Sequence, residues 1–177
     1  MKKLPILILL WVMSLNTLAQ PGDNPLEVGF DHHLGAQVPL DLLLRNERGN
    51  EVTVKELLDD KPVLLVLGYY ECPMLCHKVQ DGLVEGLTES RMRVGKEFRI
   101  LTVSVDPEET SQLAAAKRES YLKAYPYPVG QRDWPFLVGK PEALDTLQTV
   151  VGFRSAKLKD HITCPFHQSC DEALGGV

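Results

Sequence analysis

The sequence predicts an α/β fold in which a mixed sheet is flanked by helices. Short apolar segments alternate along the chain with longer segments of helical periodicity, a pattern typical of sheets that contain parallel strands. The chain has 177 residues, of which 44% are hydrophobic. This length and apolar content suit a single domain with a substantial core.

The first part of the chain contains the shorter predicted elements. Residues 20–36 are rich in turn-forming residues, so we expect an irregular lead-in there. We expect a strand at Val38–Leu44, a turn at 46–50, and a strand end followed by a short helix at 52–58. The apolar run Val63–Gly68, which a turn follows, is predicted to be the central strand of the sheet.

The later elements alternate between helices and strands. Helical spacing, alanine content and terminating proline or glycine residues define the helices. In order we expect a helix at 73–87, a strand at 98–105, a helix at 110–125, a short strand at 136–138 and a helix at 142–151. The spacing in the first helix predicts a buried side composed of Cys76, Val79, Leu83 and Leu87.

Residues 1–19 are expected to be a secretory signal peptide. Lys2 and Lys3 supply the positive region, an apolar stretch follows, and Ala19 is the small residue that precedes cleavage at Gln20. The apolar stretch is shorter than the roughly 20 residues that span a membrane, although an uncleaved anchor remains an alternative. We therefore expect the protein in the periplasm, an oxidising compartment that permits disulfides.

The charge balance of the chain bears on its partners. The formal net charge is −5, and removal of the two signal-peptide lysines makes it more negative. Because no basic stripe is visible, nucleic acid is not expected to be a partner.

Cys72 and Cys76 directly follow the predicted central strand and are four residues apart. Pro73 between them is typical of the first turn of a helix. We therefore expect a strand, a short loop and a helix, with the two cysteines one turn apart at the helix N-terminus. The helix dipole lowers the pKa of a thiol at this position, and the resulting thiolate is both a nucleophile and a metal ligand.

Two kinds of chemistry suit this cysteine pair. Helical residues four apart have Cβ atoms about 5–6 Å apart, whereas a relaxed disulfide needs about 3.5–4.5 Å. A disulfide here would therefore be strained and readily reduced. A metal ion spans a wider gap, because thiolate–metal bonds of about 2.3 Å allow the sulfur atoms to lie about 4 Å apart. Two thiolates with a histidine suit Cu(I) or Zn(II).

The run Tyr-Tyr-Glu-Cys-Pro-Met-Leu-Cys at residues 69–76 resembles the signature of the SCO1/SenC family. Members of this family are thioredoxin-like proteins that carry copper to cytochrome c oxidase. Further similar segments lie at 102–110, 114–122, 134–137 and 150–154. The resemblance covers about residues 30–154 and implies a thioredoxin-like fold for the domain at 37–177, with Cys72 and Cys76 as ligands of a copper ion.

The family's third copper ligand is a histidine that follows the cysteines in the chain. Beyond Arg154 this chain departs from the family pattern, and two histidines lie near the expected place. His167 matches by its distance from Gly152, and His161 matches another branch of the family by its preceding aspartate. The closing C-terminal strands of the fold are expected to be missing, and a frameshift or early stop in the gene is one hypothesis for this divergence.

Two further cysteines, Cys164 and Cys170, do not belong to the family's usual set. In an oxidising compartment they could form a second disulfide, or they could join a metal site with His167. If the tail is out of frame, they have no function.

Asp106 ends a predicted strand near the expected site. Its carboxylate could orient a ligand or a partner. Alternatively, Asp106 and Pro107 simply form the turn that enters the next helix.

The resemblance implies a periplasmic copper-binding protein that delivers copper to the apo copper subunit of a respiratory oxidase. Cys72, Cys76 and His167, or His161 in its place, would hold the metal. The alternative is a thiol–disulfide oxidoreductase that reduces a partner's cysteines, with Cys72 as nucleophile and Cys76 as resolving thiol. A copper carrier needs the third ligand, whereas a redox protein needs only the two cysteines.

Overall fold

The computed structural model describes residues 29–58, 60–71 and 75–155, with only the backbone of residues 75–77. Its elements are β1 (Gly29–Phe30), β2 (Leu43–Asn46), β3 (Glu51–Thr53), α2 (Val54–Leu57), β4 (Val63–Gly68), α3 (Leu75–Glu89), β5 (Arg99–Ser104), α4 (Ser111–Ala124), β6 (Phe136–Gly139), α5 (Pro141–Val151) and β7 (Phe153–Arg154). Within these ranges no helix has both the length and the apolar character needed to cross a membrane.

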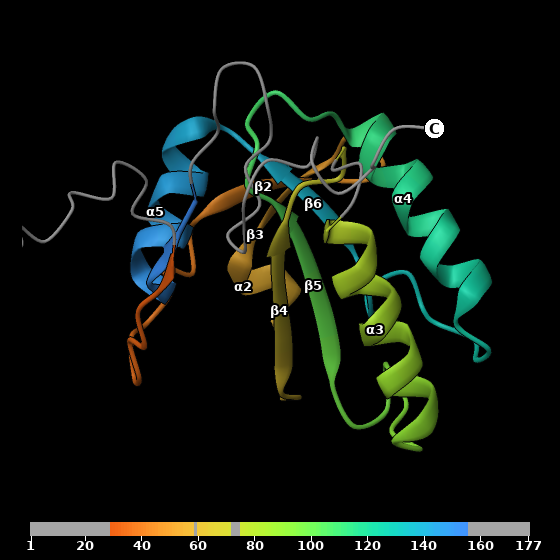
Figure 1. Cartoon of the computed structure of the whole chain (residues 1–177). Coiled ribbons are helices and arrows are strands. Elements are labelled where there is room, and N and C mark those ends of the chain that lie inside the picture. The colour runs from red at the N-terminus through yellow and green to blue at the C-terminus, as the bar shows by residue number, and fades with distance from the viewer. Residues whose placement is uncertain (1–28, 59, 72–74, 156–177) are drawn as a thin grey trace, which may run out of the picture.

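Five strands form one mixed sheet in the order β3-β2-β6-β5-β4. β4, β5 and β6 are parallel, whereas β2 is antiparallel to both β3 and β6. Figure 1 shows helices on both faces of this sheet. The predicted α/β fold, a mixed sheet flanked by helices, is therefore confirmed.

β4 has the predicted bounds, but among the described strands it is not the predicted central one. In the described sheet it pairs only with β5 and forms one edge, opposite β3. The expectation of a central strand rested on the apolar run, yet Leu64 is 40% exposed. An apolar run indicates a strand but does not reveal how many neighbours the strand has. The predicted loss of closing strands concerns residues after 155, which lie outside the described residues.

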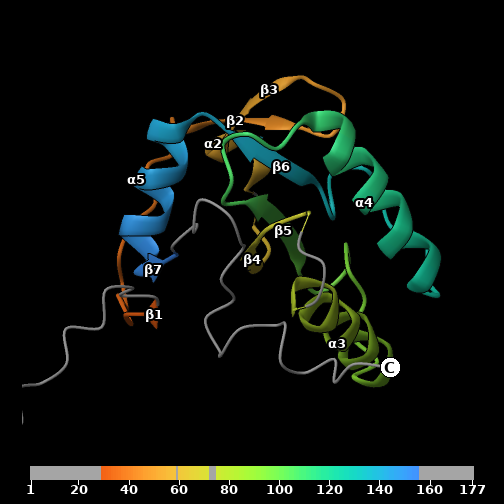
Figure 2. The same ribbon diagram turned by 45° about the horizontal axis from the view of Figure 1, so that its top comes forward.

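The two faces of the sheet carry separate apolar layers. α3 and α4 cover one face, and α2 and α5 cover the other (Figures 1 and 2). Alternate residues of β5 serve the two layers, with Ile100 in the first and Leu101 and Val103 in the second. This alternation follows from the two-residue period of a strand, and it explains why Ile100 to Ser104 are all buried.

Local capping explains where the helices begin and end. The Thr110 hydroxyl accepts a hydrogen bond from the backbone N–H of Leu113 and caps α4, which satisfies one free donor of its first turn. α5 begins at Pro141, a position where proline loses no helical hydrogen bond, and it ends at Gly152. Gly152 has a φ of 76°, the left-handed conformation that favours glycine at a helix C-terminus.

The strand predicted at Val38–Leu44 begins five residues later, at Leu43. Pro39 and Asp41 lie in a turn, closed by a hydrogen bond from the N–H of Leu42 to the carbonyl of Pro39. The strand is instead defined by its partners, since Leu44–Asn46 pairs with residues 137–139 of β6. This pairing between distant residues is not visible in the local sequence.

The predicted buried side of α3 is partly wrong. Val79 is 61% exposed, whereas Gln80, Val84 and Leu87 are buried. The buried stripe is therefore rotated by about one residue relative to the prediction and includes a polar side chain. Because α3 packs beside α4 as well as against the sheet, tertiary contacts decide which face of the helix is covered.

The predicted lead-in contains a short strand. β1 pairs antiparallel with β7, and this pairing joins the start of the described chain to its end. Asp31 forms an ion pair with Arg154, and the Asp31 N–H donates to the carbonyl of Gly152 at 2.7 Å.

Candidate metal centre

The predicted site lies where the chain passes from β4 to α3. β4 ends at Gly68 and α3 begins at Leu75 among the described residues, which agrees with the predicted strand, loop and helix. Cys72 lies outside the described residues. Cys76 is the second residue of α3, and its side chain is likewise outside them. The structure therefore describes the strand that precedes Cys72 and the helix that contains Cys76.

The other predicted ligands lie further along the chain. His161 and His167, together with Cys164 and Cys170, follow residue 155 and lie outside the described residues. Within the described ranges, no group of three or more His, Cys, Asp or Glu side chains is arranged to hold a metal ion. The described residues thus neither test nor replace the predicted ligand set.

Tyr70 anchors the loop that precedes Cys72. Its side chain is only 1% exposed, and its hydroxyl lies 2.8 Å from the carbonyl oxygen of Leu137 and 3.1 Å from that of Thr102. Its ring packs against Phe136, with centroids 5.8 Å apart. Burial raises the pKa of the Tyr70 hydroxyl well above its usual value, so this group stays a neutral donor. Tyr70 therefore ties the loop to β5 and β6.

Glu109 binds the same loop from the other side. Its carboxylate oxygens accept hydrogen bonds from the backbone N–H of Tyr70 at 2.9 Å and of Glu71 at 2.8 Å. These are consecutive amides, and the next residue in the chain is Cys72. Hydrogen bonds to an ionised acceptor are roughly twice as strong as neutral ones. A carboxylate from the β5–α4 turn thus holds the chain immediately before the first cysteine.

A tight turn after β5 positions Glu109. The Ser104 hydroxyl donates to the Glu109 carboxylate at 2.5 Å and accepts from the N–H of Asp106 at 3.0 Å. The Asp106 carboxylate accepts from the N–H of Glu108 at 3.0 Å, and the Asp106 carbonyl accepts from the N–H of Glu109 at 3.2 Å. Two roles were predicted for Asp106, a helix-entry turn and the orientation of a ligand, and these contacts form the turn. The role in orienting a ligand stays a prediction.

Glu109 was not among the site residues predicted from the sequence. The only sequence signal was its place in the turn after a buried strand, within the segment 102–110. Its contacts with Tyr70 and Glu71 join residues 39 and 38 positions apart. Such contacts arise because β4 and β5 are parallel neighbours, so their carboxyl ends meet at one edge of the sheet.

Gln80 is a second residue that the sequence analysis missed. It lies on α3 four residues after Cys76, is buried, and its side-chain carbonyl oxygen has no hydrogen-bond partner in the described structure. A buried acceptor without a partner is costly and calls for an explanation. Residues one turn apart on a helix share a face, so Gln80 lies on the same face of α3 as position 76.

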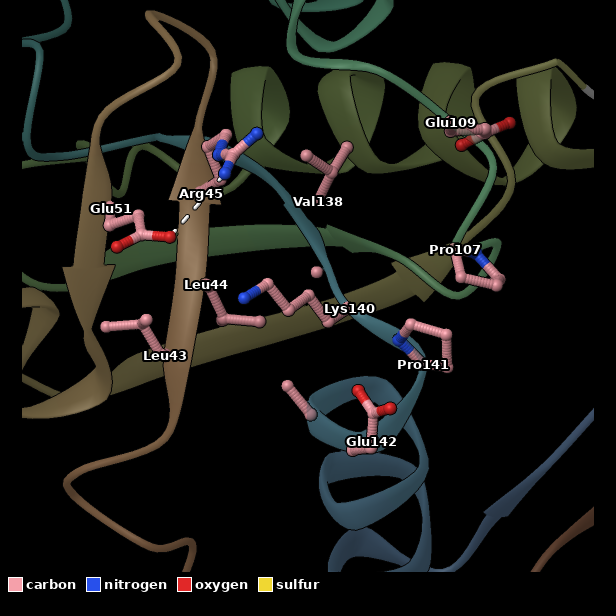
Figure 3. Close-up of a pocket in the computed structure, with 12 residues that line it drawn as sticks. Leu43, Leu44, Arg45, Glu51, Pro107, Glu109, Val138, Lys140, Pro141 and Glu142 are labelled. Atoms are coloured by element: carbon pink, nitrogen blue, oxygen red, sulfur yellow. Dashed lines mark hydrogen bonds and ion pairs between the residues drawn. The ribbon is translucent and has the colours of Figure 1, made fainter.

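A pocket of about 450 Å³ opens at the carboxyl ends of β5 and β6. Figure 3 shows Glu109 and Pro107 on one side of this pocket and Arg45 and Glu51 on the other. Its wall continues through Gly139 and Lys140 into the start of α5. Glu109 therefore borders this pocket and also binds the loop before Cys72.

The comparison with known proteins identifies the family. The sequence profile of the SCO1/SenC family matches residues 33–160, which is most of the chain. The chain belongs to the SCO1/SenC family. The matched range agrees with the resemblance predicted over about residues 30–154, and it includes the loop held by Tyr70 and Glu109.

Solved structures show the thioredoxin-like fold of this SCO1/SenC protein. Two crystal structures from Aquifex aeolicus VF5 resemble it. The first has 25% identity and a TM-score of 0.62, covering 72% of this chain and 71% of that chain. The second has 26% identity and a TM-score of 0.58, covering 68% and 72%.

A third structure is BsSco, described as a member of the Sco family of cytochrome c oxidase assembly proteins. It has 18% identity and a TM-score of 0.52, and it covers 78% of this chain and 77% of its own. At this identity the likeness shows the fold alone. No curated protein sequence matches this SCO1/SenC protein significantly.

Proposed function

We propose that this protein binds Cu(I) through the thiolates of Cys72 and Cys76 and delivers it to a copper site of a cytochrome c oxidase. The observation that carries the proposal is a cysteine pair, placed between β4 and the first turn of α3, in a chain of the SCO1/SenC family. Copper is cargo in this function, so the protein acts as a carrier rather than as an enzyme with turnover.

The donor chemistry favours a soft, monovalent metal. Thiolates select Cu(I), Zn(II) and iron–sulfur clusters over hard cations. A helix N-terminus stabilises the thiolate form, because the partial positive charge of the helix end lies near the sulfur. We further propose His167, or His161 in its place, as the third ligand, since an imidazole nitrogen complements two thiolates.

The proposed partner is the apo copper subunit of a respiratory oxidase, and the proposed compartment is the periplasm. Support for the compartment comes from the N-terminal sequence, in which two lysines precede an apolar stretch and a small residue before Gln20. An uncleaved N-terminal segment would add membrane association to the same function.

An anaerobic Cu(I) competition titration of the reduced protein tests the proposal. We expect one tightly bound equivalent, abolished by Cys72→Ser or Cys76→Ser and weakened by His167→Ala or His161→Ala, whichever residue is the ligand. The matched control is the double variant Cys164→Ser/Cys170→Ser, which removes two thiols outside the proposed pair and should keep the copper site.

The titration also separates the alternative function. If the folded, fully reduced protein binds no copper tightly, the carrier proposal is wrong. Reduction of a disulfide-bonded partner by the same sample would then favour a thiol–disulfide oxidoreductase, in which Cys72 attacks and Cys76 resolves the mixed disulfide.

A further inference from the structure

The chain segment that leads into Cys72 is held at two points. The Tyr70 side chain fixes it to the core, and the Glu109 carboxylate binds the N–H groups of Tyr70 and Glu71. A third contact lies just upstream, where the carbonyl of Gly68 accepts from the N–H of Val105 at 3.1 Å. The last described residue before Cys72 is therefore fixed through its own backbone amide.

We propose that Glu109 is a positioning residue for the thiol pair, because it holds the backbone of Tyr70 and Glu71 and so sets where the chain presents Cys72 to α3. This inference deepens the proposed function, and its copper readout rests on that function. Its redox readout does not, because the dithiol–disulfide equilibrium of Cys72 and Cys76 exists with or without copper.

The geometry of Glu109 matches this task. A carboxylate has only acceptor atoms, and here its two oxygens face two backbone N–H donors and one hydroxyl donor. A glutamine amide has the same shape but one oxygen and one NH₂ group. In Glu109→Gln the NH₂ group would face an N–H donor of the loop, so at least one of the two backbone hydrogen bonds is lost.

The two readouts should change in defined directions. From the sequence we expect Cys72 and Cys76 to lie one helical turn apart, a spacing that holds the Cβ atoms further apart than a relaxed disulfide needs. A fixed loop therefore favours the open dithiol, which can receive a metal ion without rearrangement. A released loop lets the sulfur atoms approach, so the disulfide becomes easier to form while Cu(I) binding loses preorganisation.

We expect Glu109→Gln to weaken Cu(I) affinity about tenfold. We also expect it to shift the dithiol–disulfide equilibrium about tenfold toward the disulfide, or roughly 30 mV for this two-electron couple. The potential is measured by equilibration with reduced and oxidised glutathione. In that reaction the two thiols lose two protons and two electrons, and glutathione disulfide gains them to give two glutathione thiols.

Three variants make the test specific. Glu108→Gln removes the same charge from the neighbouring residue and should leave both readouts unchanged. Leu147→Ala removes a buried side chain on the opposite face of the sheet, so it reports what general destabilisation does to both readouts. Ser104→Ala removes the 2.5 Å hydrogen bond to Glu109 and should shift the potential in the same direction as Glu109→Gln but by less. It therefore provides a test if the Glu109→Gln variant fails to fold.

Each outcome decides a different claim. A shift of the potential toward the disulfide in Glu109→Gln, larger than in Leu147→Ala, supports the positioning role. If the wild-type protein binds no Cu(I) but this shift is present, the positioning role stands and the carrier function fails. A potential that moves no further than in Leu147→Ala, or that moves toward the dithiol, overturns the positioning role whatever the copper result.

Discussion

The hydroxyl of Tyr70 lies 2.8 Å from the carbonyl oxygen of Leu137, which is 67 residues later in the chain. The two residues come from the loop after β4 and from β6, strands that do not pair with each other, since β5 lies between them. The hydrogen bond thus reaches past β5 to β6 and fixes the loop before Cys72 to the middle of the described sheet.

Tyr70→Phe should reduce the free energy of unfolding by about 1–2 kcal/mol, because it leaves a buried carbonyl without its donor. Chemical denaturation measures this change. Tyr127→Phe is the matched control, since the Tyr127 ring is half-buried beneath the Arg93 guanidinium and keeps that contact without its hydroxyl. Equal effects of the two substitutions would contradict a specific role of the Tyr70 hydroxyl.

The loss of stability caused by Tyr70→Phe should become smaller at alkaline pH. Burial raises the pKa of the Tyr70 hydroxyl above the value near 10 of an exposed tyrosine. Above about pH 10 the unfolded chain releases this proton while the folded chain keeps it, so the stabilisation is complete below that pH and declines as pH rises. Denaturation curves at pH 8 and above pH 10 should show the difference between wild type and variant shrinking. A constant difference would contradict the prediction.

Trp134 and Thr102 form a buried pair whose coupling can be measured directly. The Trp134 indole N–H donates to the Thr102 hydroxyl at 3.0 Å, and both side chains are almost fully buried. Trp134→Phe and Thr102→Val should each destabilise the fold, by about 1–3 kcal/mol for the loss of a partner in a buried hydrogen bond. In a double-mutant cycle the stability lost by the double variant should be smaller than the sum of the two single losses by about 0.5–3 kcal/mol. Strict additivity would show that the pair is not coupled.

Gly152 and Gly49 allow a test of close backbone approach. Both have positive φ values, 76° and 82°. A Cβ atom at Gly152 would overlap the carbonyl oxygen of Asp31, whereas a Cβ atom at Gly49 meets no atom within 4 Å. Gly49→Ala therefore reports the conformational strain alone, about 1–2 kcal/mol for a left-handed residue. Gly152→Ala should cost clearly more and lower the thermal midpoint further. Similar midpoints in the two variants would contradict the close approach.

Local patterns predicted several elements well. The bounds of β4 are as predicted, and α4 begins and ends within one residue of the predicted helix, at caps Thr110 and Tyr125. Gly152 ends α5 as expected. These elements are encoded by contiguous features, namely an apolar run, a capping side chain and a glycine, each of which acts over a few residues.

Elements that depend on distant partners were predicted less well. The position of β2 is set by its pairing with β6, about 90 residues later, rather than by the apolar run that precedes it. The same holds for the side of α3 that is buried, because Val79 faces outward although its spacing suggested the core. A sequence pattern gives the period of an element but not the direction from which its neighbours approach.

The sequence by itself determined the fold class, the family, and the placement of Cys72 after a strand and of Cys76 at the start of a helix. These features follow from residue types that are adjacent in the chain. Only the tertiary structure decided that β4 lies at an edge of the described sheet and that Glu109 and Tyr70 hold the chain before Cys72. The reason is physical: the parallel pairing of β4 and β5 brings their carboxyl ends together, and no local pattern records which side chain then meets which backbone amide.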